Sequence, residues 1–303
     1  MGVLTSTAAL FNAIASRLGR PPARRDAIAD DPPDAVPAEA DPPIPRITGS
    51  GHGTAGIARY DQWTEAVFGQ KIPIPGVLFA ASFAGDSVWG QKTHEALLNV
   101  ELAYVEHLCR QLKNNDVPGA LVEFGVFEGW WINHFYEVCE KLGLDRPVIG
   151  YDSFQGLSSP HPVHDDAFWQ AGQYAASLDA VSRNVKLAER RRIKLIPGFF
   201  SDSLRTPDAV AVGEIAYARI DCDIYEPALD CLRYLGPRLA DGAVLVLDDW
   251  PHRLEVGEAR AFHDWASTVP HLRFEFLFFG TWGHFYTRVW HHDPASPGGT
   301  LTP

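Results

Sequence analysis

Five short apolar runs, interleaved with stretches of helical pattern, are the feature that most constrains the fold of this chain. The runs are rich in Val, Ile and Leu, and they are Ala120–Phe124, Pro147–Tyr151, Ile193–Ile196, Ile215–Ile220 and Ala243–Leu247. Continuous apolar character is typical of strands that are buried on both faces of a parallel sheet. Helical spacing of apolar residues is found at about 129–142, 174–190, 225–239 and 256–267. This alternation predicts an α/β doubly wound sheet with helices on both faces.

Two further apolar runs, Phe274–Phe279 and His284–Val289, follow the fifth predicted strand. Only residues 280–283 separate them, which is too short a segment for a crossover helix. The two runs must therefore pair as an antiparallel hairpin. The predicted sheet has five parallel strands and a C-terminal antiparallel hairpin, and residues 56–115 are expected to form helices that precede it.

The rest of the chain divides by composition. Apolar residues at helical spacing predict an amphipathic helix over residues 1–18. Residues 19–54 are rich in proline, which fixes φ and lacks an N–H donor, so they are expected to form a linker. The folded domain is expected over residues 55–291, and residues 292–303 are expected to form a flexible tail.

Charge and cysteine content exclude several classes of protein. Asp and Glu (38) outnumber Lys and Arg (26), giving a formal charge of −12, whereas nucleic-acid binders carry a basic surface. No apolar run reaches the roughly 20 residues of a membrane-spanning helix, and residues 1–20 lack the features of a secretory signal. The four cysteines form no CxxC pair, which favours reduced thiols. We therefore expect a cytoplasmic protein with no nucleic-acid or membrane partner.

The first predicted strand leads into a glycine-containing turn. Glu123 lies near the end of the strand, and Gly125 and Gly129 follow before the next helix. Glycines at this point let the backbone approach a nucleotide-like ligand closely, although a tight turn between strand and helix explains them equally well. Asp152, at the end of the second predicted strand, is placed to accept ribose hydroxyls, or alternatively to cap a turn.

Four aspartates follow the fourth and fifth predicted strands. Asp221 and Asp223 come after the fourth strand, and Asp248 and Asp249 after the fifth. Because the carboxyl ends of neighbouring parallel strands meet at the ligand-binding edge of such sheets, we expect these carboxylates to converge. Their mutual repulsion calls for a cation, and an all-oxygen set suits Mg²⁺, Mn²⁺ or Ca²⁺. Asp223 or Asp249 individually could instead be a helix N-cap.

A long insertion follows the second predicted strand. It covers about residues 155–172 and contains His161 and His164. A loop of this length is a candidate lid over the site. Solvated loop histidines are commoner than catalytic ones, so the sequence does not assign either histidine a role in catalysis.

Taken in order, five motifs of the chain resemble the macrocin O-methyltransferase family. They are Val122–Gly129, Asp152–Leu157, Pro197–Leu204, Arg219–Tyr225 and Asp248-Asp249, within a match over about residues 90–268. The resemblance implies the class I methyltransferase fold, S-adenosylmethionine as the methyl donor and Mg²⁺ or Mn²⁺ as the metal. It also implies a hydroxylated small-molecule acceptor, expected to be a sugar of a glycosylated natural product.

The resemblance also assigns roles to individual residues. Glu123, Gly125 and Gly129 would line the methionine and ribose end of the cofactor. Asp152 would bind its ribose, and Ser153 would lie near the adenosine. Asp221, Asp248 and Asp249 would be the metal ligands. Asp223, together with metal-bound Asp221, would be catalytic, with Asp223 as the general base that deprotonates the acceptor hydroxyl before in-line methyl transfer.

The chain departs from the family pattern next to the glycine turn. Where the family usually has an arginine and paired glycines, this chain has Glu128, Gly129 and Trp130. The charge is reversed and a small residue becomes large, so the methionine-end pocket or the acceptor is expected to differ.

Three alternatives remain open at this point. A nicotinamide-dependent oxidoreductase leaves the four carboxylates unexplained and lacks the GxGxxG motif. A catalytically silent binding protein of the same fold is the second, and methylation of a non-sugar vicinal diol or catechol is the third. The N-terminal helix also makes a homodimer or larger homo-oligomer plausible.

Overall fold

The structure is a computed structural model that describes residues 54–72, 88–250 and 255–292, all within the compact unit His52–Pro303. The predicted N-terminal helix, linker and tail lie outside the described residues, apart from Thr54 and His292 at their borders. Among the described helices, none is both long enough and apolar enough to cross a bilayer.

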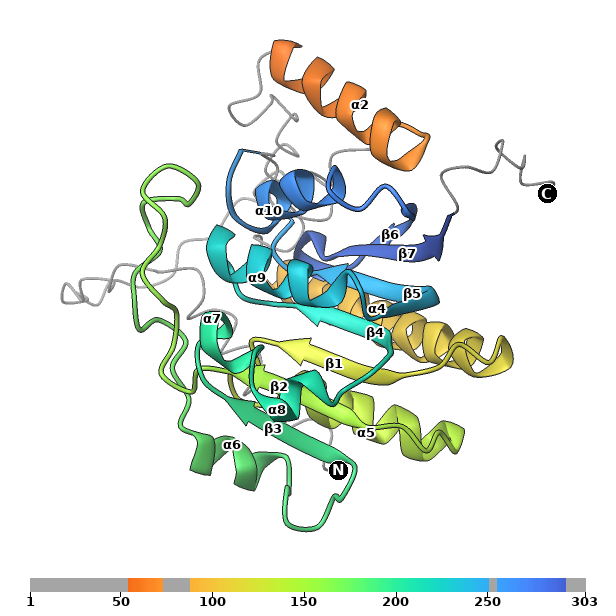
Figure 1. The fold of residues 1–303 in the computed structure, drawn as a ribbon, viewed down its shortest axis with the longest axis vertical. Coiled ribbons are helices and arrows are strands. Elements are labelled where there is room, and N and C mark those ends of the chain that lie inside the picture. Colours follow the sequence, from red (N-terminus) through yellow and green to blue (C-terminus); the bar gives the residue numbers. More distant parts are fainter. Residues whose placement is uncertain (1–53, 73–87, 251–254, 293–303) are drawn as a thin grey trace, which may run out of the picture. The chain divides into compact units, whose positions relative to one another are not determined.

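Seven strands form one mixed sheet in the order β3-β2-β1-β4-β5-β7-β6 (Figure 1). The first five are parallel to one another, and β7 lies antiparallel between β5 and β6. The prediction of a parallel sheet that ends in an antiparallel hairpin is confirmed. The strands are β1 Ala120–Phe124, β2 Val148–Asp152, β3 Ile193–Pro197, β4 Ile215–Ile220, β5 Leu239–Leu247, β6 Leu272–Phe279 and β7 Phe285–His291.

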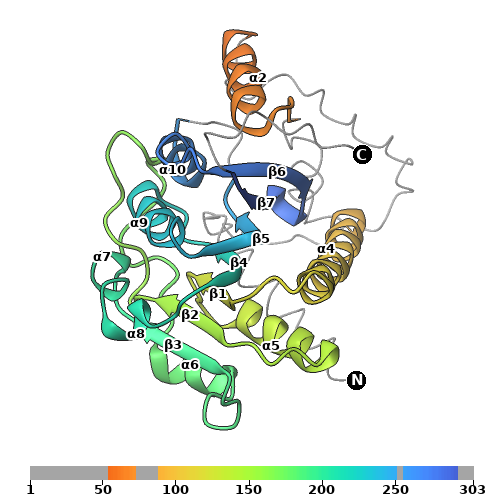
Figure 2. The ribbon, with the colours of Figure 1, turned by 45° about the vertical axis from the view of Figure 1, so that its right-hand side comes forward.

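Helices cover both faces of the sheet, with α4 and α5 on one side and α9 and α10 on the other (Figure 2). The longer helices are α2 Thr54–Phe68, α4 Val88–Asn114, α5 Trp130–Leu142, α9 Tyr225–Leu235 and α10 Gly257–Ala266. The shorter ones are α6 Leu178–Asn184, α7 Phe200–Ser203, α8 Pro207–Val210 and the 3₁₀ turn η1 Thr281–Gly283. The strand order reverses between β1 and β4, and ligands bind at such a switch point in open α/β sheets.

Two predicted helices are shorter in the structure than the sequence pattern indicates. The helix expected over 174–190 is reduced to α6, Leu178–Asn184. The helix expected over 225–239 ends at Leu235, because Gly236 and Pro237 follow and proline cannot supply the next N–H donor. As a result β5 begins at Leu239, before the apolar run that predicted it.

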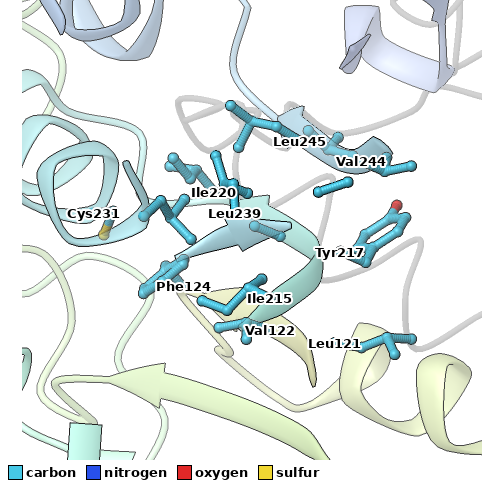
Figure 3. Packing of buried hydrophobic residues seen from close by; sticks show 14 of the residues in the cluster. Leu121, Val122, Phe124, Ile215, Tyr217, Ile220, Cys231, Leu239, Val244 and Leu245 are labelled. Carbon is cyan, nitrogen blue, oxygen red and sulfur yellow. The ribbon is translucent and has the colours of Figure 1, made fainter. Parts of the chain in front are cut away.

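The core lies on both faces of the central strands. Every residue of β1, β2 and β4 is buried, whereas the edge strands β3 and β6 are partly exposed. Figure 3 shows side chains of β1, β4 and β5 packed together, with Cys231 of α9 beside them. All four cysteines are buried free thiols, as the sequence predicts.

Helix α2 joins this core through aromatic side chains. Trp63 stacks on Trp250 with ring centroids 5.9 Å apart, and Phe68 stacks on Phe262 of α10 at 6.0 Å. Trp250 directly follows Asp248 and Asp249, and it is 2% exposed. The chain that leaves β5 is therefore held on its apolar side by α2 and α10.

Candidate functional site

The carboxyl ends of β1, β4 and β5 are joined beyond the last residue of each strand. The backbone N–H of Asp221 donates to the carbonyl of Phe124 (2.8 Å), and that of Asp248 donates to the carbonyl of Ile220 (2.8 Å). The backbone hydrogen bonding between neighbouring strands therefore continues as far as Asp221 and Asp248. This continuity confirms that β4 and β5 are neighbours, as the sequence predicts.

Three of the four aspartates form an acidic cluster. Asp221, Asp248 and Asp249 each offer a carboxylate oxygen, and these three oxygens lie within 4.8 Å of one another. Asp221 and Asp248 are buried, and the Oδ2 atom of Asp249 is buried with no hydrogen-bond partner among the described residues. Asp223 is not a member of this group; it has a left-handed backbone conformation (φ 65°) and lies just before α9 begins.

A buried arginine lies beside the cluster. Arg219, in β4, is 1% exposed; its Nη2 contacts the Oδ1 of Asp248, and its Nε lies 3.9 Å from the Oδ2 of Asp221. The guanidinium also lies 4.1 Å from the centre of the Trp131 ring on α5. Carboxyl groups therefore outnumber the guanidinium in this cluster, and such a surplus of acidic groups attracts a cation.

Asp248 is also held from the hairpin side of the sheet. The Nε2 of His284 lies 3.0 Å from the Oδ1 of Asp248, and its Nδ1 lies 2.7 Å from the Oε1 of Glu101 on α4. Glu101, which is 1% exposed, also accepts hydrogen bonds from the hydroxyl of Tyr286 (2.6 Å) and the backbone N–H of Thr281 (2.8 Å). Burial alone would raise the pKa of Glu101, but His284 and Arg219 outweigh it and lower the pKa to about 2.

A second buried carboxyl group lies on the other side of the strand ends. Glu258, in the first turn of α10, is fully buried and accepts backbone hydrogen bonds from Cys222 and Asp249. Burial raises the pKa of Glu258 well above its usual value, and the nearby charge of Asp249 raises it further. Glu258 therefore binds a proton more readily than an exposed glutamate does.

The predicted cofactor residues surround the turn after β1. Gly125 has φ 89°, and a Cβ at this position would lie 1.7 Å from the carbonyl oxygen of Asp221. Gly129 has φ 86°, and a Cβ there would lie 2.5 Å from the side chain of Val185. Both glycines are therefore required by packing within the chain itself. Glu123 is 1% exposed and lies opposite Arg219 in the register of β1 with β4.

Asp152 and Ser153 support the same turn. The Oδ2 of Asp152 accepts hydrogen bonds from the backbone N–H groups of Val126 (2.7 Å) and Phe127 (3.0 Å), and its Oδ1 accepts one from Phe154 (2.6 Å). Burial raises the pKa of Asp152 in spite of these bonds. Ser153 donates to the carbonyl of Gly156 and accepts from the backbone N–H of Gln155.

The loop between β2 and α6 contains no helix or strand and reaches across to α9 and α10 (Figure 1). Asp165 accepts hydrogen bonds from the backbone N–H groups of His161 (2.6 Å) and Tyr225 (2.7 Å), and the carbonyl of His164 accepts one from Gly257 (2.7 Å). The rings of His161 and His164 stack with centroids 4.4 Å apart. The candidate lid is therefore attached to the first residue of each of these two helices.

Sequence reasoning did not identify four of these residues as part of the site: Glu101, Arg219, Glu258 and His284. Arg219 stands two residues before Asp221, and a charged residue inside an otherwise apolar strand was a usable signal. Glu101 and His284 are 183 residues apart, and nothing local in the sequence pairs them. The same holds for Glu258 and Cys222, which are 36 residues apart.

Comparison with known proteins identifies the family. Residues 87–269 match the Macrocin-O-methyltransferase (TylF) family. The chain is 29% identical over 199 residues to the demethyldecarbamoylnovobiocin O-methyltransferase of Streptomyces niveus, covering 60% of this chain and 73% of that protein. It is 30% identical over 172 residues to a rhamnosyl-tetracenomycin-C 4'-O-methyltransferase of Streptomyces olivaceus, covering 54% of this chain and 64% of that protein.

Solved structures agree on the fold. The O-methyltransferase NovP and the calicheamicin methyltransferase CalS11 each superpose with a TM-score of 0.52 and 24% sequence identity. The NovP match covers 63% of this chain and 79% of NovP, and the CalS11 match covers 62% and 78%. The sheet is thus that of a class I methyltransferase. Because the family match spans more than half of its length, the chain belongs to the macrocin O-methyltransferase family and is an O-methyltransferase.

Proposed function

We propose that this protein transfers a methyl group from S-adenosylmethionine to a hydroxyl group of a glycosylated natural product, with a divalent metal ion held by Asp221, Asp248 and Asp249. The acidic cluster is the observation that carries the proposal. The acceptor class rests on relatives whose names specify novobiocin, rhamnosyl-tetracenomycin and mycinamicin substrates.

The acidic cluster has the chemistry that a hard dication requires. Mg²⁺ prefers oxygen ligands and is commonly held in proteins by carboxylates. The three carboxylate oxygens lie within 4.8 Å of one another, so a single ion could contact all three. The buried Oδ2 of Asp249 has no other hydrogen-bond partner among the described residues. When bound, a divalent ion lowers the pKa of an alcohol and orients its oxygen.

We assign the proton-accepting role to Asp223. Asp223 is 6% exposed, lies two residues after Asp221 and takes a left-handed backbone conformation that turns it out of the line of β4. The carboxylate of Asp223 would take the acceptor's proton if it lies within hydrogen-bond reach of the hydroxyl. Asp221, Asp248 and Asp249 would meanwhile orient the acceptor, and the loop between β2 and α6 would exclude water.

We place the cofactor along the turn after β1. Glu123, Gly125 and Gly129 would line its methionine and ribose end, Asp152 would accept ribose hydroxyls, and Ser153 would lie near the adenosine. A carboxylate has about four acceptor positions and Asp152 uses three on backbone N–H groups, so it retains capacity for a ligand. This placement puts the donor at the switch point between β1 and β4.

The substitution Asp221→Asn tests the metal role. It removes one ligand charge and should lower methyl transfer at least about 100-fold, because the acceptor is no longer activated and held. Calorimetric titration should show that S-adenosylhomocysteine binds about as tightly as in the wild type, since the cofactor residues are unchanged. Asp208→Asn, at an exposed carboxylate of α8, is the control that should leave turnover unchanged. Near-normal turnover of Asp221→Asn would contradict the metal role.

A further inference from the structure

Glu258 has an unusual place among the charged residues of the molecule. Its side chain is fully buried in the first turn of α10, and both carboxyl oxygens face backbone N–H groups. The Oε1 atom accepts hydrogen bonds from Cys222 (2.9 Å) and Asp223 (3.3 Å), in the segment after β4. The Oε2 atom accepts one from Asp249 (3.2 Å), in the segment after β5. One side chain thus connects two separate strand ends.

The backbone N–H groups that donate to Glu258 belong to one member of the acidic cluster, Asp249, and to the two residues that follow another member, Asp221. Cys222 directly follows Asp221, and Asp249 is itself a cluster member. Buried N–H groups without an acceptor are costly, so each of these bonds stabilises one backbone conformation. Asp223 is held at φ 65°, a conformation that costs a non-glycine residue roughly 1–2 kcal/mol.

The start of α10 packs closely enough to make this connection rigid. A Cβ at Gly257 would lie 3.0 Å from the carbonyl oxygen of Asp223, so the helix begins directly against the turn. The backbone N–H of Gly257 also donates to the carbonyl of His164 (2.7 Å). Glu258 therefore extends from a helix terminus that is itself fixed on two sides.

We infer that Glu258 is a positioning residue that joins the ends of β4 and β5 and thereby sets the spacing of Asp221, Asp248 and Asp249. The inference rests on the proposed metal role of these aspartates. Glu258 is not one of the three clustered carboxylates, and both of its oxygens are engaged by the backbone. Glu258 acts by fixing the two backbone segments to which the proposed metal ligands belong.

Two substitutions separate this role from a general contribution to stability. Glu258→Gln keeps the size of the side chain, but an amide has one acceptor oxygen, so one of the two strand ends loses its hydrogen bond. Glu258→Ala removes both connections. Asp264→Asn, a carboxyl-to-amide change on the same helix, is the matched control, because among the described residues the Asp264 carboxylate bonds to the side chains of Tyr225, Arg260 and His263 and to no backbone N–H after β4 or β5.

The first readout is amide hydrogen exchange resolved to single residues by NMR in the full-length protein. Glu258→Gln should speed exchange either at Asp249 or at Cys222 and Asp223, and Glu258→Ala should speed it at both ends. Asp264→Asn should leave these amides unchanged. Where Glu258→Ala fails to fold, the isosteric Glu258→Gln decides the question. Unchanged exchange in Glu258→Gln would overturn the inference.

The second readout is the affinity for Mn²⁺, measured by electron paramagnetic resonance. Loss of a residue that supports metal ligands typically lowers metal affinity 10–100-fold, and we expect a loss of about this size in Glu258→Gln, with S-adenosylhomocysteine affinity retained. Equal Mn²⁺ affinity in wild type and Glu258→Gln would overturn the inference while leaving the proposed function intact. A wild-type protein that binds no Mn²⁺ would instead contradict the proposed function, because Asp221, Asp248 and Asp249 would then not be metal ligands.

Discussion

At the scale of single residues, Gly125 shows how closely the ends of β1 and β4 approach each other. A Cβ at this position would lie 1.7 Å from the carbonyl oxygen of Asp221, the first residue of the acidic cluster. No side-chain rotation relieves a contact with backbone, so any other residue must push the two strand ends apart. Gly125, which the sequence assigns to cofactor binding, is thus also needed for the backbone of Asp221 to lie in its place.

This geometry predicts a clear difference between two glycine substitutions. Gly143, after α5, has φ 61°, and a Cβ there would meet nothing within 4 Å, so Gly143→Ala should cost only about 1 kcal/mol of backbone strain. Gly125→Ala should cost several times more or prevent folding, because it adds a backbone collision to the same strain. Urea unfolding of both variants checks this, and an equal loss of stability in the two would contradict the packing described for β1 and β4.

At the scale of elements, α5 carries an aromatic group beside the site. Its first turn places Trp131 under the guanidinium of Arg219, and His134, one turn later, stacks on Trp130 with ring planes 11° apart. Burial lowers the pKa of His134 to about 4, and the neighbouring carboxylates only partly offset it. The histidine is therefore part of the apolar surface that α5 presents and favours the neutral form.

The pH dependence of stability follows from this shift. In the unfolded chain a histidine binds a proton near pH 6.5, whereas folded His134 resists protonation down to about pH 4. Stability should therefore fall as pH drops from 6.5 to 4, by roughly 1 to 2 kcal/mol between pH 7 and pH 5. His134→Gln should remove this part of the slope in urea unfolding at the two pH values. Identical slopes in wild type and variant would show that His134 is not the group responsible.

At the scale of the whole molecule, the sequence predicted the features that depend on local patterns. Apolar runs with no polar alternation became β1, β2 and β4, which are buried on both faces, and the short connection at 280–283 forced the hairpin of β6 and β7. Helix ends were less predictable: α9 stops at Leu235 because of the Gly236-Pro237 pair, in spite of the apolar residues beyond it. The pattern of apolar residues indicates which side faces the core, but not where the helical hydrogen bonds end.

Only the aspartates at the strand ends were predictable from the sequence; the residues that contact them were not. Adjacent strands with aspartates at their ends brought Asp221, Asp248 and Asp249 together, as parallel strand order requires. The groups behind them come from α4, α10 and β7, and their positions depend on how helices pack across the sheet. Such long-range pairs leave no periodic signal in one sequence. The sequence predicted a cation that offsets the repulsion between these carboxylates, and Arg219 supplies part of that positive charge from within the chain.

The position of a bound metal ion tests the central claim most directly. Crystals of the wild-type protein with S-adenosylhomocysteine would be soaked in MnCl₂, and anomalous differences recorded at the manganese edge. We expect one peak, bonded by Asp221, Asp248 and Asp249, with Arg219 still held against Asp248. Absence of a peak at these three carboxylates would contradict metal-assisted methyl transfer at this site.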